Sequence, residues 1–336
     1  MKNSIRRRDF IKTTAATGLG LSIGGSLFAG ALRQDSGKRV GIIGLDTSHS
    51  LAFAKALNSP EAGAEYKGYK VVAAYPYGSK KIKSSAERIP GYIEDIKKLN
   101  VAIVGSIQEL LKDVDVVLLE TNDGHLHLEQ ALEVLKAGKR MFIDKPIAAS
   151  LSDAIAIFEA SEQFNIPVFS ASSLRYINGV KDLDKDKVIG ADTYSPSTYE
   201  ASHPDLFWYG VHGVETLFTV MGTGCQDVVR INTPDTDVVV GTWEGGRIGT
   251  FRGTRTGKAG YGGTVFTESG KMELGPYGGY EPLLVEIIKY FETGEVPVSP
   301  EETLEIFAFM EAADESKRNG GKPVKIKNIM EQAKNK

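Results

Sequence analysis

The segment RVGIIGLDTSHS, residues 39–50, decides the fold of this chain. It begins as a short apolar run, typical of a buried strand, and the following SLAFAKALN has apolar residues at helical spacing. A strand that passes through glycine into a helix is typical of a nucleotide-binding α/β unit. Two more glycines are expected after Gly44, but the chain has Asp46 at the first of these places and Ser48 or His49 at the second.

The altered turn leaves two interpretations open. Glycines in such a turn let backbone N–H groups approach a pyrophosphate at the helix N-terminus. An aspartate would repel that anion unless it turns away or caps the helix, and Asp46 and the two residues after it are all capping types. The segment is therefore either a capped helix start or a modified cofactor turn. In the second case, the cofactor-binding candidates are Gly41, Gly44, Thr47, Ser48 and His49.

The composition is that of a soluble globular protein. The chain has 336 residues, of which 41% are hydrophobic and 25% charged, enough for two domains with a buried core. A pI near 6.0 gives no support for nucleic-acid binding. The single cysteine, Cys225, excludes an intrachain disulfide and a metal cage of thiolates.

The first 31 residues resemble an export signal of the twin-arginine type. RRDFIK at residues 7–12 precedes a weakly apolar, glycine-rich run, and Ala29 and Ala31 form an A-x-A cleavage pattern. The alternative is a membrane anchor, which the many glycines disfavour. We therefore expect a periplasmic or otherwise exported protein without a stable membrane span after cleavage.

Strands and helices alternate from residue 38 to about 172. This pattern predicts a Rossmann domain, in which a doubly wound parallel sheet is covered by helices on both faces. Strands with glycine-rich turns then follow one another, and two helices come near the C-terminus. We expect residues 173–336 to form an α+β domain with an open, mostly antiparallel sheet.

The segment YPYGSKK follows the second predicted strand. An acidic residue at this place usually binds the ribose of a cofactor that has no 2′-phosphate, but here Ser79, Lys80 and Lys81 follow instead. A hydroxyl and lysines suit a 2′-phosphate, which favours NADP over NAD, with Ser79 and Lys80 as its ligands. A solvated lysine pair at the start of a surface helix explains the segment equally well.

Residues 120–150, ETNDGHLHLEQALEVLKAGKRMFIDKPIAAS, carry a resemblance to a known family. The histidine, the AGK run and the DKP tripeptide resemble the ordered T-P-N-x-x-H, A-L-x-A-G-K and E-K-P motifs of the Gfo/Idh/MocA oxidoreductases. The Thr-Pro is absent, and aspartate replaces the glutamate. The resemblance extends over about residues 38–327. It implies cofactor binding by Thr121, Asn122, His127, Asp144 and Lys145.

Lys145 is the first catalytic candidate. Pro146 ends its strand, so the lysine is expected at the carboxyl edge of the sheet, where such folds bind ligands. An ammonium there can donate hydrogen bonds to the nicotinamide ribose and to a substrate hydroxyl. The resemblance implies a catalytic-site role, and the alternative is an ordinary surface lysine.

His212 and Glu215 are the other catalytic candidates. They are three residues apart at the start of a predicted helix, so they share a face. The family pattern D-x-G-x-H-x-x-D implies that His212 takes or gives the hydroxyl proton and that Glu215 orients it, although Trp208 replaces the first aspartate. Capping or packing is the alternative role for His212, and His203 or Asp205 is a possible substitute for the missing carboxylate.

Aromatic residues near the second catalytic segment suit the face of a sugar ring, although such clusters more often belong to a core. The substrate-binding candidates are Arg175, Tyr176, Trp208 and His212. A metal site from His203, His212 and Glu215 is conceivable, but the ligand spacing is weak and no metal is expected.

The sequence therefore predicts an exported NAD(P)-dependent oxidoreductase that acts on CH–OH groups of a sugar, polyol or related compound. An exported enzyme lacks a pool of free cofactor, so tight binding of NADP or NAD is expected. The resemblance also implies that residues 173–336 bind the substrate and carry the surface through which a homodimer or homotetramer forms. The alternative is a redox-inactive relative that binds a carbohydrate or serves as an accessory protein, which the altered glycine turn favours.

Overall fold

The computed structural model of the chain describes residues 38–258 and 260–335. The expected export signal lies outside these residues, so it stays a prediction. From Lys38 onward the chain forms one compact unit. Within the described residues, none of the helices has the length and apolar character needed to cross a membrane.

The first sheet has six parallel strands in the order β3-β2-β1-β4-β5-β6. The chain runs outward from β1 in one direction and then from β4 in the other. The point of reversal between β1 and β4 is where ligands bind in doubly wound folds. The strands are β1 (Arg39–Ile43), β2 (Lys70–Tyr75), β3 (Ala102–Ile103), β4 (Val116–Leu119), β5 (Arg140–Ile143) and β6 (Phe169–Ser170).

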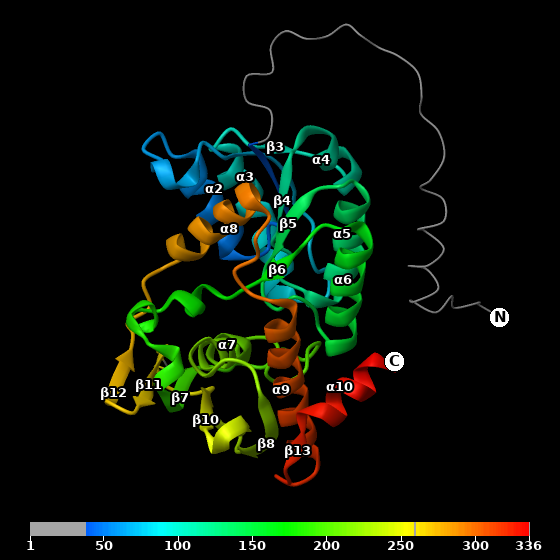
Figure 1. Cartoon of the computed structure of the whole chain (residues 1–336). Coiled ribbons are helices and arrows are strands. Elements are labelled where there is room, and N and C mark those ends of the chain that lie inside the picture. The colour runs from blue at the N-terminus through cyan, green and yellow to red at the C-terminus, as the bar shows by residue number, and fades with distance from the viewer. Residues whose placement is uncertain (1–37, 259, 336) are drawn as a thin grey trace, which may run out of the picture. The chain divides into compact units, whose positions relative to one another are not determined.

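Helices cover both faces of this sheet, as the predicted fold class requires (Figure 1). Successive side chains of a strand point to opposite faces, and both sets are apolar here. Ile42 and Leu118 belong to one core cluster, whereas Ile43 and Leu119 belong to the other. The connecting helices are α2 (Ser48–Asn58), α3 (Lys83–Lys97), α4 (Ile107–Asp113), α5 (Gly124–Lys136) and α6 (Leu151–Phe164).

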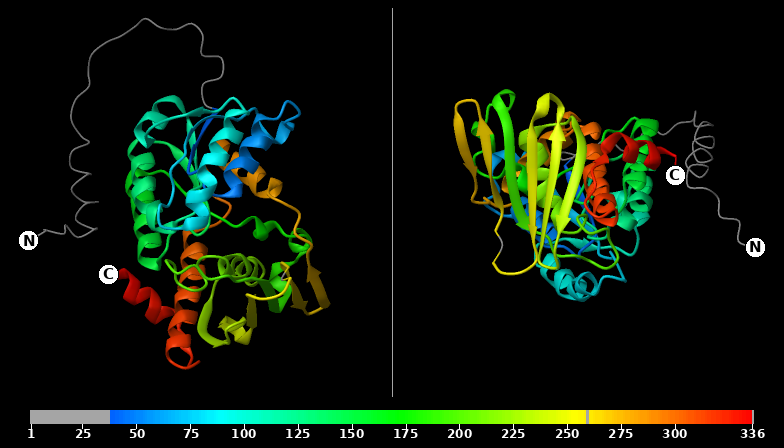
Figure 2. Two further views of the ribbon diagram at one scale, coloured as in Figure 1. Left: turned by 180° about the vertical axis from the view of Figure 1, so that it is seen from behind. Right: turned by 90° about the horizontal axis from the view of Figure 1, so that it is seen from below.

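The second sheet has seven strands in the order β12-β11-β7-β10-β9-β8-β13, and Figure 2 shows it from below. Only β7 and β10 pair in parallel, so the sheet is mostly antiparallel as predicted. Its strands are β7 (Val188–Pro196), β8 (Cys225–Asn232), β9 (Thr236–Trp243), β10 (Ile248–Thr254), β11 (Gly262–Thr267), β12 (Gly270–Leu274) and β13 (Val324–Lys325).

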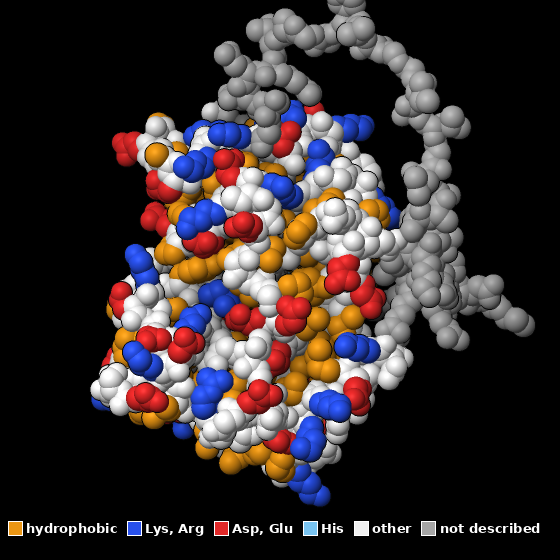
Figure 3. Space-filling model, in the orientation of Figure 1, with side chains coloured by type: hydrophobic (Ala, Val, Ile, Leu, Met, Phe, Trp, Pro, Cys, Tyr) orange, Lys and Arg blue, Asp and Glu red, His pale blue; other side chains and the backbone are white. Residues whose placement is uncertain are grey.

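One face of the second sheet is covered and the other is open. Helices α7 (Gly210–Met221) and α9 (Pro300–Arg318) pack on the covered face. Large apolar side chains that are exposed on the strands are Ile189, Tyr194, Ile231, Ile248 and Phe266. On the face of the molecule seen in Figure 3, acidic and basic side chains are intermixed.

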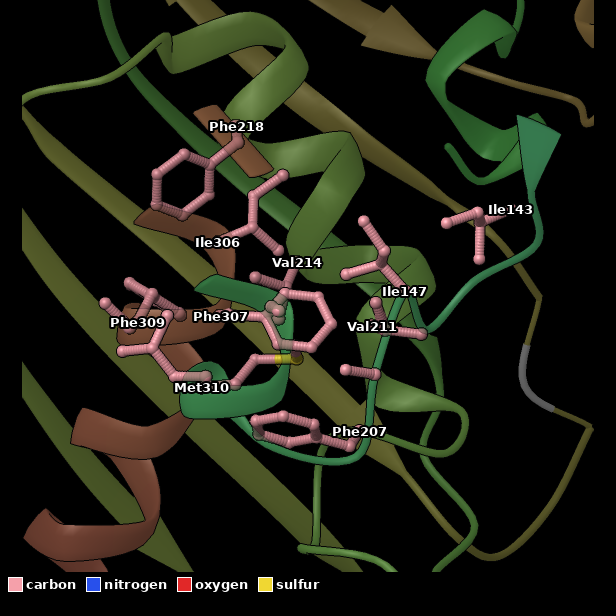
Figure 4. Packing of buried hydrophobic residues seen from close by; sticks show 14 of the residues in the cluster. Ile143, Ile147, Phe207, Val211, Val214, Phe218, Ile306, Phe307, Phe309 and Met310 are labelled. Carbon is pink, nitrogen blue, oxygen red and sulfur yellow. The ribbon is translucent and has the colours of Figure 1, made fainter. Parts of the chain in front are cut away.

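The two sheets share a hydrophobic core. Ile143, the last residue of β5, and Ile147 in the loop after it belong to the same cluster as Val211 on α7 and Phe307 on α9 (Figure 4). Helix α8 (Glu281–Thr293) follows the second sheet in the chain yet packs on the first, where Leu284 joins the cluster of β1 and α2. The last helix is α10 (Ile326–Lys334). The domain boundary expected at residues 172/173 stays a prediction, since residues 38 onward form one unit.

Candidate functional site

A pocket with about 160 Å³ of free volume lies at the carboxyl edge of the first sheet. Its walls come from the turn after β1, from α3, from the loops after β4 and β5, and from the second part of the chain. The residues that line it are Thr47, Ser48, His49, Ser84, Arg88, Asn122, Lys145, Ser173, Leu174, Trp208, Tyr209, His212, Tyr261, Tyr277 and Tyr280. The fold thus brings together candidates that lie up to 165 residues apart, from Thr47 to His212.

The turn after β1 presents the start of α2 to this pocket. Gly44 has a φ of +93°, and a Cβ there would lie 2.5 Å from the backbone nitrogen of Thr121, so only glycine fits. Thr47 is the N-cap of α2 and accepts a weak hydrogen bond from the His49 N–H at 3.5 Å. The Ser48 hydroxyl lies 3.4 Å from that of Tyr280. A helix N-terminus flanked by hydroxyl groups is a ready site for a phosphate.

Asp46 does not face the pocket. Its side chain is fully buried and accepts hydrogen bonds from the backbone N–H groups of Ser79 at 3.2 Å and Asn122 at 3.0 Å. Burial raises the pKa of this carboxyl to about 6. The aspartate therefore fastens the loops after β2 and β4 to the turn, and it is Thr47 that caps α2. The sequence left two ways for an aspartate here to avoid repelling a pyrophosphate: it could turn away or cap the helix. In the structure Asp46 turns away.

Lys145 lines the pocket beside a buried group of ionisable residues. Its Nζ lies 3.5 Å from Oδ2 of Asp144, whose Oδ1 lies 2.9 Å from Nδ1 of His49. Burial works to raise the pKa of Asp144, but His49 and Lys145 outweigh it and hold the pKa well below its ordinary value. Burial, together with the charge of Asp144, raises the pKa of the neighbouring Glu120 well above its ordinary value. Asp144 therefore carries the charge that His49 and Lys145 face, and burial beside it disfavours a second charge on Glu120.

His212 lies in the same pocket with a fixed orientation. Its Nδ1 is 2.7 Å from the hydroxyl of Ser172, which leaves Nε2 for a ligand. Burial, followed by the charges of Lys145 and His49, lowers the pKa of His212 well below 6.5. The imidazole is therefore neutral at neutral pH and is able to accept a proton.

Glu215 makes no contact with the imidazole among the hydrogen bonds and ion pairs of the described residues. Its carboxylate accepts from the backbone N–H of Ser172 at 2.9 Å and from Nε of Arg175 at 3.0 Å. Glu215 was expected to orient the His212 ring directly. In the structure Ser172 contacts the ring, and Glu215 holds the loop of Ser172 in place. The reason is that the carboxylate, one helical turn beyond His212, meets the loop rather than the ring.

Several other candidates lie outside the pocket lining. Arg175 is buried and pairs with both Glu215 and Glu302, and Tyr176 beside it does not line the pocket. His127 is fully buried, with Nε2 2.6 Å from the carbonyl oxygen of Thr121 and Nδ1 3.2 Å from that of Ile147. It therefore ties the loop after β4 to the loop that carries Lys145.

The remaining cofactor candidates are divided by burial. Gly41 faces α4, where a Cβ would lie 3.0 Å from the Val114 side chain, so its place concerns packing. The Ser79 hydroxyl is buried and accepts from the backbone N–H groups of Lys81 and Ile82 at the approach to α3. Lys80 is exposed, and the expected preference for NADP stays a prediction.

Sequence reasoning missed much of the pocket wall. Ser84 and Arg88 lie four residues apart on α3 and so share a face of that helix. Tyrosines supply a second missed group, and the hydroxyl of Tyr277 lies 2.8 Å from that of Ser173. The spacing of YGGY at residues 277–280 was the available signal, since glycines between aromatic residues outside an element indicate a loop at a surface or a ligand.

Comparison with known proteins finds a family model that matches the part of the chain with the first sheet. Residues 38–171 match the model for the GFO_IDH_MocA oxidoreductase family with an NAD-binding Rossmann fold. An uncharacterized oxidoreductase of Streptococcus pneumoniae is 28% identical over 120 residues, which is 33% of this chain and 32% of that protein. The matched region therefore spans about a third of the length of this curated relative.

Solved structures share the fold over most of the chain. The scyllo-inositol dehydrogenase from Lactobacillus casei with bound NAD(H) and scyllo-inositol has a TM-score of 0.68 at 15% identity, covering 86% of this chain and 99% of that one. The myo-inositol 2-dehydrogenase from Lactobacillus plantarum has a TM-score of 0.68 at 16% identity, covering 85% and 98%. At such identities, the likeness concerns the fold.

Proposed function

Because the chain carries the NAD-binding Rossmann domain of the Gfo/Idh/MocA oxidoreductase family at residues 38–171, we propose that it is an NAD(P)-dependent oxidoreductase acting on a CH–OH group of a cyclic polyol or sugar. The observation that carries the proposal is the meeting of Lys145 and a neutral His212 in one pocket, at the sheet edge where this fold binds ligands.

The residues present fit a dinucleotide at the start of α2. Thr47 and Ser48 offer hydroxyls beside the helix N-terminus, Arg88 offers a guanidinium to a phosphate, and Asp46 keeps its charge away from the pocket. Asn122 and Lys145 would hold the nicotinamide ribose. When bound, the cofactor supplies the hydride acceptor or donor.

Residues of the chain accept and return the proton of the substrate hydroxyl. Ser172 fixes the His212 ring through Nδ1, so Nε2 is the atom that takes the hydroxyl proton during oxidation and returns it during reduction. The Lys145 ammonium donates a hydrogen bond to the same substrate oxygen, whose developing negative charge it stabilises. Trp208 and Tyr209 line the pocket from the second part of the chain.

A ring-shaped polyol is the substrate class that we favour. Two structures that share the fold are inositol dehydrogenases, and the tyrosine hydroxyls at positions 209, 261, 277 and 280 give the pocket several groups that donate and accept hydrogen bonds. Flat aromatic side chains with hydroxyl groups suit a polyol ring, because the faces of such a ring are apolar and its edge carries hydroxyl groups.

Export and assembly belong to the same proposal. An exported enzyme would retain its cofactor and recycle it between an oxidised and a reduced substrate. The open face of the second sheet, with Ile231 exposed by 65% and Ile248 by 52%, is the surface on which we expect a homodimer or homotetramer to form. A redox-inactive carbohydrate-binding protein is the second candidate, favoured by the loss of the second glycine to Asp46.

The first experiment measures dinucleotide released by denaturing protein that was expressed with its signal. Near-stoichiometric NAD(H) or NADP(H) is expected, together with a change in absorbance at the reduced-nicotinamide band when inositols and sugars are added. Lys145→Met should retain the dinucleotide and lose on the order of 100-fold in turnover or more. Protein that holds no dinucleotide and binds none when it is added would overturn the redox proposal and favour the binding protein.

A further inference from the structure

A second group of polar side chains lies beside the pocket and has no part in the mechanism above. Asp123 and His125 stand at the start of α5, and His203 comes from the loop before α7. Nδ1 of His125 is 2.8 Å from Oδ1 of Asp123, and Nε2 of His203 is 3.6 Å from the same oxygen. The two imidazole rings lie 4.7 Å apart. Loops far apart in the sequence thus converge on one carboxylate oxygen.

His203 carries an unsatisfied nitrogen at the centre of this group. Its side chain is 0% exposed, and Nε2 has no hydrogen-bond partner within the described residues. Nδ1 lies 3.0 Å from the Ser202 hydroxyl, which can accept the ring proton there and leave a lone pair on Nε2. A buried polar atom without a partner has a cost that a ligand would remove.

We propose that Asp123, His125 and His203 bind a divalent transition-metal ion of the Zn²⁺ class through Oδ1, Nδ1 and Nε2. The three ligand atoms lie within 4.8 Å of one another. At Zn–N and Zn–O distances near 2.1 Å, ligand atoms of a tetrahedral site are about 3.4 Å apart, between the two distances seen here. Two imidazoles and one carboxylate are a donor set of zinc sites that keep a fourth position open.

The surroundings suit such an ion. The other side of the Asp123 carboxylate contacts the Ser79 side chain, so the ligand is itself held in place. The His125 side chain is 49% exposed, which gives an ion a path from solvent. The other grouping of potential ligands in the described residues, His49, Glu120 and Asp144, has the Lys145 ammonium 3.5 Å from Asp144, and that positive charge opposes a cation.

A bound ion would connect the two parts of the protein beside the pocket. Asp123 and His125 belong to the loop after β4 and the start of α5, whereas the His203 ring lies 5.1 Å from the ring of Trp208, which lines the pocket. The ion would therefore fix the wall formed by Trp208. This proposal does not depend on the nature of the cofactor.

The test uses the purified full chain, stripped with a chelator and titrated with Co²⁺ as a spectroscopic probe for Zn²⁺. One equivalent should produce the visible absorption bands of a tetrahedral Co²⁺ site, and Zn²⁺ should abolish them. His125→Asn is the main variant because this side chain is half exposed, and its affinity should fall on the order of 100-fold. Glu129→Gln, on an exposed position of the same helix, is the matched control and should bind as the original does.

Thermal unfolding supplies the second readout. Zn²⁺ should raise the melting temperature of the original protein and of Glu129→Gln, because an ion that binds only the folded state stabilises it. At the same Zn²⁺ concentration the rise should be clearly smaller in His125→Asn, because its affinity is lower. The proposal fails if no bands appear with Co²⁺, or if His125→Asn binds Co²⁺ as tightly as Glu129→Gln does.

Discussion

Single residues in the pocket are controlled by their buried neighbours. The His212 ring meets Ser172 on one side and faces the charges of Lys145 and His49 on the other, while Glu215 lies behind Ser172. Lys145 and His212 were identified from the sequence because their motifs are local. Ser172 was not, because it is 40 residues from His212 and nothing in its own segment marks it.

The protonation of His212 can be measured without knowledge of the substrate. Its ring signal in an NMR titration should remain that of a neutral imidazole as the pH falls through 6.5, and it should change only well below that value. Since the unfolded chain takes up this proton near pH 6.5 and the folded one does not, the depression also makes the fold less stable as the pH falls below about 6.5.

A pair of lysine variants separates the causes of that shift. Lys145→Met removes a positive charge near the ring, so the pKa of His212 should rise. Lys80→Met removes a charge from an exposed residue that does not line the pocket, and it should leave the titration unchanged. An unchanged pKa in Lys145→Met would contradict the assignment of Lys145 to the His212 environment.

At the scale of elements, most helices and strands form where capping residues and apolar spacing predict them, and helix α3 is the exception discussed below. Ser150, a typical capping residue, begins α6 by accepting a hydrogen bond from the Asp153 N–H, and Gly138, with a φ of +71°, follows the end of α5. Helix α3 lies where the sequence favours a surface helix only as an alternative to a phosphate-binding loop, and it contains Pro90 and Gly91, which usually interrupt a helix. It persists because Ile89 and Ile96 are buried in the fold, a tertiary contribution that outweighs the local preference.

The turn after β1 gives an element-scale prediction. Gly44→Ala should destabilise the protein by about 3 kcal/mol or more, because it combines a strained positive φ with a Cβ placed 2.5 Å from the Thr121 backbone. Gly138→Ala is the control: its φ is also positive, at +71°, but a Cβ there meets nothing within 4 Å, so about 1 kcal/mol is expected.

Denaturant unfolding of the two glycine variants makes the comparison. Equal losses in the free energy of unfolding would mean that backbone strain alone accounts for Gly44 and that the close approach of the turn to Thr121 has no cost. That result would contradict our account of this turn.

The whole molecule is held together by contacts between segments distant in the chain. The shared core joins both sheets, and α8 crosses back to the first sheet. A buried ionic network adds to this on the second sheet, where Arg230 of β8 pairs with Asp237 of β9, with Asp314 of α9 and with Asp205. Burial raises the pKa of Asp314 to about 6, so the pairing with arginine is what permits its charge.

Removal of the central guanidinium should therefore be costly. Arg230→Met removes the ion pair of the buried Asp314 and leaves Asp237 with Arg255 and Asp205 with Lys317 as their remaining cations. Because Asp314 and Asp237 are buried, we expect a loss of about 3–5 kcal/mol in the free energy of unfolding. Arg252→Met, which changes an exposed arginine of β10, should alter it by less than about 0.5 kcal/mol. Urea titrations of both variants test this, and a loss below about 1 kcal/mol in Arg230→Met would refute the structural importance of the network.

The sequence alone determined the fold class, the alternation of elements in the first sheet, the antiparallel character of the second, and the two pocket residues Lys145 and His212. The features of the fold follow from periodicity and capping types, and Lys145 and His212 follow from short motifs that resemble those of the Gfo/Idh/MocA family. All of these are properties of neighbouring residues. Only the tertiary structure decided that Asp46 turns away, that Ser172 holds His212, and that the Asp123, His125 and His203 side chains converge. The reason is that each of these depends on loops brought together by burial of a common core, and local spacing carries no record of which distant loops will meet.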